Sequence, residues 1–369
     1  MYLKEIKTYN FRNLIDQSIE FSSGVNVIVG KNGQGKTNIL EAINILSTVK
    51  SFRSSRIAET IGWNKSEASV FGSVVDKNGS TKNLGIAIEK RNKTVFLNDS
   101  QIRSADEYIG NLICITFTPD DLELVKGGPG ERRKFLDRAL SFLDPKYIRT
   151  ISAYNTALRS KNTILRESYS IPKGVVFDQL DSWNRILAKH GSEILSKRKN
   201  FASTLTSRSK KLYWSFAPET EELELSLKSA RNNIEPSEFL LFEELTEARE
   251  REHAQGQSIV GPHRDDLVIS LSGNDSRAFA SQGQTRSIVL SLKLALIEEI
   301  ESRLGTAPVI LLDDVDSELD QGRREAFFTA ILEYGRQVVI TTTDAKEIPV
   351  SNNRISEFKM NSGSLIKHS

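Results

Sequence analysis

The feature that most constrains this chain is a glycine-rich loop set between an apolar strand and a helix. Residues 30–37 read Gly-Lys-Asn-Gly-Gln-Gly-Lys-Thr and match the phosphate-binding pattern G-x-x-x-x-G-K-[ST] at every specified position. Residues 25–29, Val-Asn-Val-Ile-Val, predict a strand before the loop, and the apolar spacing of residues 38–46 predicts a helix after it. A chance glycine-rich turn would not need those neighbours, so the context favours a phosphate site.

The residue types in this loop suit a nucleoside triphosphate with Mg²⁺. Gly30, Gly33 and Gly35 let the backbone curl, so that its N–H groups and the helix N-terminus face an anion. Lys36 adds positive charge for the β- and γ-phosphates, and the Thr37 hydroxyl can ligate Mg²⁺. We expect ATP to be bound by all eight loop residues, Gly30, Lys31, Asn32, Gly33, Gln34, Gly35, Lys36 and Thr37.

A later stretch supplies the carboxylates that such a loop requires. Residues 308–314 read Pro-Val-Ile-Leu-Leu-Asp-Asp, an apolar strand that ends in two acids. Asp313 is predicted to serve Mg²⁺ or its waters, and Asp314 to orient or deprotonate the attacking water. Asp314 and Lys36 are therefore the predicted catalytic residues, and Thr37 and Asp313 the predicted metal ligands. The alternative is that the two acids have no role in catalysis and only form a surface turn after a core strand.

A second anion site is predicted where a long helix begins. Residues 280–284 read Ala-Ser-Gln-Gly-Gln, and the helical pattern runs from there to residue 304. Ser281, Gly283 and Gln284 would offer a hydroxyl, free backbone amides and the positive end of the helix dipole. One nucleotide needs only one such helix end. The simplest explanation for two such helix ends in one chain is a head-to-tail homodimer, in which each Ser281 helix contacts the γ-phosphate bound by the other copy.

The order of strands and helices indicates an α/β ATPase head with a mixed sheet and an inserted helical lobe. Strands are expected at residues 3–9 and 18–21, in hairpins between 68 and 102, and at 113–117. Helices follow at residues 131–143, 146–168 and 178–213, and the alternating pattern returns from residue 267. We expect three segments: 1–118 and 261–369 for the head, and 119–260 for the lobe. Residues 361–369 are expected to fray.

Charge is unevenly distributed although the chain as a whole carries only +2. Residues 132–211 hold 18 Lys and Arg against 6 Asp and Glu, whereas residues 219–252 hold 4 against 11. Solvated helix faces would explain this, and so would an arm whose residues 197–199 and 208–211 neutralise nucleic-acid phosphates. Trp183, Tyr213 and Trp214 could stack on bases, although helical aromatics are more often core residues.

Composition limits the alternatives. A hydrophobic fraction of 38% with 27% charged residues is typical of a globular protein, and no apolar run reaches the ~18 residues of a membrane span. The single cysteine, Cys114, lies in an apolar run, so burial is expected and a disulfide within one chain is impossible. Lys4, Glu5 and Lys7 are charged where a secretory signal would have its apolar core, so no such signal is expected. We expect a cytoplasmic protein with no membrane partner.

Together, these motifs resemble those of the ATP-binding-cassette ATPases, which carry a phosphate loop, a Ser-x-Gly-Gln signature, an apolar-Asp-Asp strand and a Ser-Glu-Leu-Asp loop in that order. The chain resembles the chromosome-maintenance and recombination branch, and within it the RecF family of bacterial DNA replication and repair proteins. The resemblance covers nearly the whole chain, and its most specific segments are residues 119–125, 128–137, 261–266 and 311–320.

The resemblance implies a cytoplasmic protein that dimerises with ATP and binds DNA near single-strand gaps or single-strand/double-strand junctions. It also implies that the protein helps RecO and RecR load recombinase, which supports repair and the SOS response. Lys36 and Thr37 would bind phosphate and Mg²⁺, and Asp313 would bind the metal. Ser281, Gly283 and Gln284 would contact the nucleotide held by the other copy. Asp314 stands where many cassette ATPases have Glu, so a slow, DNA-stimulated ATPase is expected.

The sequence departs from the cassette pattern at two places. Residues 341–344, Thr-Thr-Thr-Asp, replace the transporters' switch histidine, and no Gln follows the strand near Phe117, which leaves Asp120 or Asp121 as a substitute. The basic side chains that could contact nucleotide, partner copy or DNA, or else form structural salt bridges, are Arg12, Arg132, Arg133 and Arg264.

Two other functions stay open at this point. The chain could be the nucleotide-binding subunit of another cassette ATPase, such as a transporter, although its charged insertion argues against this. It could also be a scaffold that binds ATP and scarcely hydrolyses it.

Overall fold

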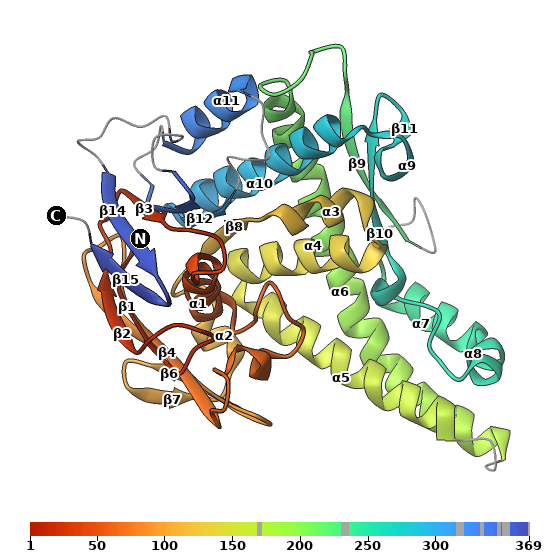
Figure 1. Ribbon diagram of the computed structural model, residues 1–369. Coiled ribbons are helices and arrows are strands. Elements are labelled where there is room, and N and C mark those ends of the chain that lie inside the picture. The colour runs from red at the N-terminus through yellow and green to blue at the C-terminus, as the bar shows by residue number, and fades with distance from the viewer. Residues whose placement is uncertain are drawn as a thin grey trace. The chain divides into compact units, whose positions relative to one another are not determined.

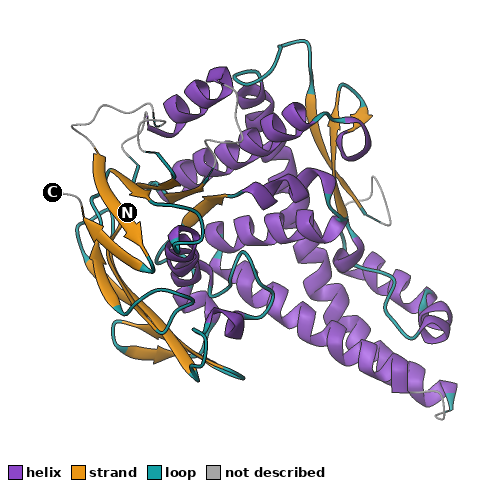
Figure 2. Ribbon diagram, in the orientation of Figure 1, coloured by secondary structure: helices purple, strands orange, loops and turns teal. Residues whose placement is uncertain are grey.

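The structure is a computed structural model that describes residues 1–167, 172–229, 236–314, 321–332, 336–344, 348 and 355–367. The chain packs as two compact units, shown with their elements labelled in Figure 1 and coloured by secondary structure in Figure 2. The first unit comprises Met1–Asp121 and Leu290–Ser369, and the second comprises Leu122–Val289. The predicted α/β class, with a mixed sheet and an inserted helical lobe, is confirmed.

One sheet of the first unit is antiparallel and has the order β2-β1-β4-β5-β6-β7. Its strands are β1 (Tyr2–Tyr9), β2 (Gln17–Glu20), β4 (Glu67–Val75), β5 (Thr81–Glu89), β6 (Lys93–Leu97) and β7 (Ser100–Ile102). The hairpin between β4 and β5 forms because the Asp76 carboxylate accepts hydrogen bonds from the amides of Asn78 (2.8 Å) and Ser80 (3.0 Å). The hairpins expected between residues 68 and 102 are confirmed.

The other sheet of the first unit has the order β15-β14-β3-β13-β12-β8. Its strands are β3 (Val25–Val29), β8 (Cys114–Phe117), β12 (Val309–Asp313), β13 (Val338–Thr342), β14 (Ile355–Asn361) and β15 (Ser364–Lys367). All neighbours run parallel except β14 and β15. Every residue of β12 is buried, which explains its continuous apolar run, and Cys114 is buried as expected.

Helix α1 (Lys36–Thr48) packs against both sheets of the first unit. It contacts β4 and β5 of the antiparallel sheet and β8, β12 and β13 of the parallel one. Its central residues from Ile39 to Leu46 are therefore all buried, polar Asn44 and Glu41 included. The other helical elements that lie in this unit are η1 (Ile57–Thr60), α2 (Ala105–Tyr108) and α11 (Gln321–Leu332).

The second unit is mainly helical. Its helices are α3 (Glu123–Lys126), α4 (Pro129–Leu143), α5 (Pro145–Glu167), α6 (Lys173–Tyr213), α7 (Glu238–Glu247), α8 (Arg249–Gln255), η4 (Pro262–Arg264) and α9 (Ser276–Phe279). Helix α6 has 41 residues, about 60 Å at the usual rise, and it continues through Gly191. A Cβ there would lie 2.7 Å from Leu241 and 3.2 Å from Tyr154, so glycine permits this close packing. Two elements bridge the units along the chain, η2 (Pro119–Leu122) and α10 (Gln282–Leu304).

A small antiparallel sheet, β11-β10-β9, completes the second unit. Its strands are β9 (Leu223–Lys228), β10 (Asp266–Leu271) and β11 (Asn274–Asp275). We expected the lobe to end at residue 260, whereas the second unit runs to Val289. The reason is that β10 pairs with β9 along its full length, from Asp266 opposite Lys228 to Leu271 opposite Leu223, which keeps residues beyond 260 in this unit.

The expectation that residues 361–369 fray was wrong for the described part of that segment. The β14–β15 hairpin spans residues 355–367, and β14 pairs in parallel with β3. Phe358, Met360 and Leu365 are buried in the core of the first unit, so burial of apolar side chains orders the segment.

Candidate functional site

The phosphate loop has the backbone that its glycines predicted. Gly33 and Gly35 have φ of 78° and 111°, in the region that side chains disfavour. Gly30 follows β3 and its amide donates to the Thr342 carbonyl (3.2 Å) at the end of β13. Helix α1 then begins at Lys36, so the loop leads directly into a helix N-terminus.

Lys36 folds back over this loop. Its Nζ donates to the Gly30 carbonyl (2.5 Å) and to Asn32 Oδ1 (3.4 Å). Burial lowers the pKa of Lys36, while the nearby carboxylates of Asp314 and Asp313 act to raise it. The lysine is therefore close both to the loop and to the two predicted acids, as a phosphate-binding lysine requires.

Thr37 and Asp313 meet as predicted, although they are far apart in sequence. Thr37 Oγ1 donates to Asp313 Oδ1 at 2.9 Å, and Thr341 Oγ1 donates to the same oxygen at 2.8 Å. Burial raises the pKa of Asp313, and the hydrogen bonds from Thr341 and Thr37 act against that rise. A hydroxyl and a carboxylate are the hard oxygen donors that Mg²⁺ uses beside nucleotide phosphates, so the residues fit this ion.

Asp314 lies just beyond the end of β12 in a backbone conformation that few residues adopt. Its φ is 51°, and its amide donates to the Thr341 carbonyl at 3.3 Å. A non-glycine residue in this region stores strain, which is common where a side chain must be aimed at a site. Its predicted role with water stays a prediction. Residues 317–320, Ser-Glu-Leu-Asp, lie outside the described residues.

The C-terminal hairpin supports the phosphate loop, which sequence reasoning missed. The Gly363 amide donates to the Gln34 carbonyl at 2.9 Å, and the Ser362 amide donates to Gln34 Oε1 at 2.5 Å. A Cβ on Gly30 would lie 2.8 Å from the Met360 carbonyl, so the hairpin backbone also sits close to the start of the loop. The available signal was the Ser-Gly pair flanked by alternating apolar residues, which is a hairpin pattern.

Arg12 is occupied by a structural ion pair. Its Nε and Nη2 donate to both carboxylate oxygens of Glu41, at 2.9 and 2.8 Å. The Glu41 side chain is 0% exposed and also accepts a hydrogen bond from Ser51. Arg12 therefore ties the β1–β2 connection to α1, and this arrangement supports the structural alternative over a nucleotide contact.

The Ser281 helix start forms a reciprocal cap. Ser281 Oγ accepts from the Gln284 amide (3.2 Å), and Gln284 Oε1 accepts from the Ser281 amide (2.8 Å). Ser281 is exposed and Gly283 is half-buried. The start of α10 is therefore an ordered helix N-terminus in the second unit, and its contact with a nucleotide in another copy stays a prediction.

Several charges of the basic arm are paired within the chain, which favours the structural interpretation for those residues. Arg198 is buried and binds both oxygens of Asp137, Lys197 pairs with Asp144, and Lys210 pairs with Glu222. The side chain of Tyr213 is 0% exposed, so it is a core residue that cannot stack on a base. Counting charges along a helix does not show which ones its neighbours neutralise.

The Gly261–Asp266 segment is the centre of a buried polar network in the second unit. Arg198 Nη1 donates to the Pro262 carbonyl (2.7 Å) and contacts Asp265 (3.3 Å). Burial raises the pKa of Asp265 to about 6, against the opposing effect of Arg198. Basic residues of α4 join the network: Arg132 binds both oxygens of Asp266, and Arg133 donates to the Asp265 carbonyl. Two of the candidate contact arginines are thus structural.

Two further candidates also have structural partners. Arg264 donates through Nε and Nη2 to the Ser258 carbonyl, at 3.3 and 2.9 Å. Asp121 forms an ion pair with Lys293 and accepts from the Thr118 amide at 2.6 Å. Asp121 is therefore held by partners within the first unit, which argues against its taking the place of the glutamine that cassette ATPases carry after this strand. Asp120, the other candidate for that place, is exposed.

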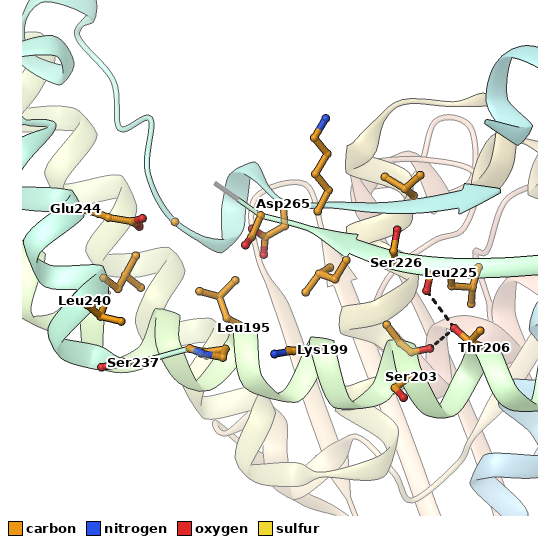
Figure 3. A pocket seen from close by; sticks show the side chains of 18 of the residues that line it. Leu195, Lys199, Ser203, Thr206, Leu225, Ser226, Ser237, Leu240, Glu244 and Asp265 are labelled. Atoms are coloured by element: carbon orange, nitrogen blue, oxygen red, sulfur yellow. Dashed lines mark hydrogen bonds between the residues drawn. The ribbon is translucent and has the colours of Figure 1, made fainter. Parts of the chain in front are cut away.

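A cleft of about 830 Å³ opens in the second unit between α6, β9 and α7 (Figure 3). Lys199 and Ser203 of α6 face it from one side, and Leu240 and Glu244 of α7 from another. Asp265 also lines it. The cleft is therefore next to the Gly261–Asp266 network and is not lined by the described residues of any nucleotide motif.

Neither a membrane span nor a protein-only metal cluster occurs in the part of the chain that the structure describes. None of the helices in those ranges combines the length and the apolarity needed to cross a bilayer. The same ranges contain no group of three or more His, Cys, Asp and Glu side chains placed to hold a metal ion.

Comparison with known proteins identifies the class to which this fold and site belong. The family described as RecF/RecN/SMC N terminal domain matches residues 2–365. The Smc head bound to the C-winged helix domain of ScpA has the same fold, with a TM-score of 0.57 at 16% identity over 100% of this chain and 97% of that one. The protein is an ATP-binding-cassette-type head of this class.

Within that class, the chain belongs to the RecF family of DNA replication and repair proteins. The RecF of Desulfitobacterium hafniense is 36% identical over 352 residues, which cover 94% of this chain and 95% of that protein. The RecF of Bacillus subtilis is 34% identical over 374 residues and 100% of both chains. A structure of the recombination mediator protein RecF with ATP, in the RecFOR pathway, matches with a TM-score of 0.89 at 34% identity, over 100% of this chain and 98% of that chain.

Proposed function

We propose that this protein is an ATP-switched DNA-binding protein of recombinational repair and replication. Two copies pair when ATP is bound, at single-strand gaps or single-strand/double-strand junctions, and help RecO and RecR load recombinase in support of the SOS response. The protein works in the cytoplasm and hydrolyses ATP slowly, with stimulation by DNA. The transporter alternative loses its support, because relatives that match nearly the whole chain are replication and repair proteins.

The observation that carries the proposal is the meeting of Thr37 and Asp313 beside the phosphate loop. These residues are far apart in sequence, and a nucleotide site explains why a loop threonine, a strand-end acid and Lys36 lie together. The relative solved with ATP has the same fold over this whole chain.

Each residue of the site has a defined task in the proposed reaction. The loop amides and Lys36 bind and neutralise the phosphates, and they orient the γ-phosphate for in-line attack. Thr37 and Asp313 would hold Mg²⁺, which when bound neutralises phosphate charge. Asp314 takes the proton from the attacking water. Its side chain is one methylene shorter than Glu, so we expect poor alignment and slow turnover.

Completion of the site by a second copy is part of the proposal. The phosphate loop and the Ser281 helix start are both helix N-termini that attract anions, and a monomer would have one more than its nucleotide needs. Pairing of two copies head to tail would use both. The bound triphosphate would then control the affinity between copies, and hydrolysis would release them.

DNA binding is proposed for the basic helices of the second unit, through their exposed basic side chains. Those of α5 and α6 include Arg159, Lys189 and Lys211. A double variant, Lys189→Glu with Lys211→Glu, should weaken binding to gapped DNA and reduce its salt dependence. If the double variant binds gapped DNA with unchanged affinity and unchanged salt dependence, α6 is not part of the DNA interface.

Sedimentation with and without ATP and gapped DNA tests the switch directly. Wild-type protein should sediment as a dimer only with ATP, and DNA should favour the dimer. Lys36→Met should stay monomeric with ATP, because it loses the charge that binds the phosphates. A Lys36→Met variant that still dimerises with ATP would contradict the site, and equal DNA affinity with and without ATP would contradict the switch.

A further inference from the structure

Glu221 is a polar residue that the nucleotide motifs do not include, and it binds one of them. It lies in the connection between α6 and β9, and its Oε1 accepts a hydrogen bond from Gln284 Nε2 at 3.0 Å. Its Oε2 accepts from the Tyr213 hydroxyl at 2.5 Å, and its carbonyl accepts from Trp214 Nε1 at 3.0 Å. One residue therefore joins the C-terminal end of α6 to the start of α10.

This contact fixes the orientation of the Gln284 amide. Gln284 Oε1 accepts from the Ser281 amide and Nε2 donates to the Glu221 carboxylate. Turning the amide over would place its NH₂ group against an N–H donor and its oxygen against a carboxylate, so only the observed orientation is stable. Because Ser281 Oγ accepts from the Gln284 amide, the serine hydroxyl hydrogen remains able to donate outward.

The turn before Ser281 is held from another element by Lys126. Its Nζ donates to the carbonyl oxygens of Ser276 (3.2 Å), Arg277 (3.2 Å) and Ala280 (2.5 Å). Three acceptors match the three hydrogens of an ammonium group. Lys126 thus fixes the chain on the N-terminal side of Ser281, while Glu221 fixes it on the C-terminal side through Gln284.

We propose that Glu221 is a positioning residue for the Ser281–Gln284 helix start. By binding Gln284, Tyr213 and Trp214 together, it holds the end of the basic helix α6 and this helix start in one fixed arrangement. The proposal rests on the function proposed above, because the helix start matters for activity only if it contacts nucleotide in a second copy. A carboxylate is needed here because it accepts two side-chain hydrogen bonds at once and strengthens both by its charge.

The test compares Glu221→Ala with Glu222→Ala, a matched control from the next position. Glu222 is exposed, and its carboxylate pairs with Lys210 of the same helix end instead of with Gln284. The midpoint of ATP-driven dimerisation is measured by sedimentation, and monomer affinity is measured with a fluorescent ATP analogue. Loss of a charge-assisted hydrogen bond should raise the dimerisation midpoint about tenfold in Glu221→Ala and leave monomer affinity within about twofold.

Conservative variants separate positioning from folding. Glu221→Gln keeps an acceptor oxygen but presents an NH₂ group to one of its partners, so its midpoint should lie between those of Glu221→Ala and wild type. If Glu221→Ala does not fold, Glu221→Gln decides: a midpoint equal to that of Glu222→Ala overturns the proposal. If wild-type protein does not dimerise with ATP at all, the function proposed above fails instead. Equal midpoints for Glu221→Ala and Glu222→Ala, with a wild type that dimerises, would refute the positioning role alone.

Discussion

His263 should make the stability of the protein depend on pH, and the size of the effect can be worked out from its surroundings. The Tyr154 hydroxyl lies 2.6 Å from Nδ1, and the Ser258 carbonyl lies 3.2 Å from Nε2. A carbonyl can only accept, so Nε2 carries a hydrogen; in the neutral ring Nδ1 then accepts from the Tyr154 hydroxyl. Burial, the main cause, lowers the pKa of His263 from 6.5 to about 4.

Whether acid stabilises or destabilises the protein depends on whether the folded or the unfolded state binds the His263 proton at the higher pH. The unfolded chain protonates His263 near pH 6.5, whereas the folded protein resists until about pH 4, so stability is lost as pH falls between these values. Between pH 7 and pH 5 this residue alone should remove about 2 kcal/mol from the free energy of unfolding.

Asp265 changes the stability in the opposite direction over the same pH range, so the experiment must separate its contribution from that of His263. Its pKa is raised from 3.8 to about 6, so the folded protein binds this proton more tightly and gains stability as pH falls from 6. Comparing wild type with His263→Gln removes this contribution, since Asp265 is present in both. The glutamine amide can still accept from Tyr154 and donate to the Ser258 carbonyl, but it does not titrate.

The measurement is urea unfolding of both proteins at pH 7 and pH 5. Wild type should lose about 2 kcal/mol more than His263→Gln between the two pH values. If the two proteins lose the same free energy, within about 0.5 kcal/mol, the buried neutral histidine is not what the native state contains and the reasoning is refuted.

Three other predictions concern the nucleotide site and its support. Ser281→Arg should leave ATP binding by the monomer intact and block ATP-driven dimerisation on a sizing column; a collapse of monomer affinity would instead place Ser281 at its own chain's nucleotide. Asp314→Asn should slow phosphate release by about a hundredfold, because the base is lost, whereas equal rates in the two proteins would indicate a scaffold. Arg12→Met should lower the free energy of unfolding by about 3 kcal/mol, because Glu41, 0% exposed, loses its bidentate partner. A loss below about 1 kcal/mol in thermal or urea melts would show that Ser51 and Arg53, whose Nη1 lies 3.9 Å from the Glu41 carboxylate, suffice.

The parts of the site that could be predicted from the sequence are those with local signals. The phosphate loop, its strand and its helix are contiguous, so periodicity and glycine spacing were enough to place Gly30, Lys36 and Thr37. Asp313 was predictable because an acid at the end of a buried strand is visible within a short stretch of sequence. That it lies 2.9 Å from Thr37 required only that parallel strands of one sheet end at the same edge.

The parts that sequence reasoning missed depend on partners distant along the chain. Arg198 was assigned to a basic arm because its neighbours are basic, but its partners Asp137 and Asp265 lie 61 and 67 residues away. Glu221 carried no signal, since one acid among many in residues 219–252 cannot be singled out without knowing that Gln284 lies beside it. The C-terminal hairpin was missed because its polar tip hid the buried apolar residues around it.

The strand that leads into the phosphate loop has a consequence for the order in which the protein can be made. β3 is flanked in its sheet by β13 and β14, which begin only at Val338 and Ile355. A chain still being synthesised therefore exposes the loop long before either neighbouring strand has left the ribosome. The nascent protein should be unable to hold a nucleotide until both strands have emerged, so a copy that still lacks them could not compete with finished ones for ATP.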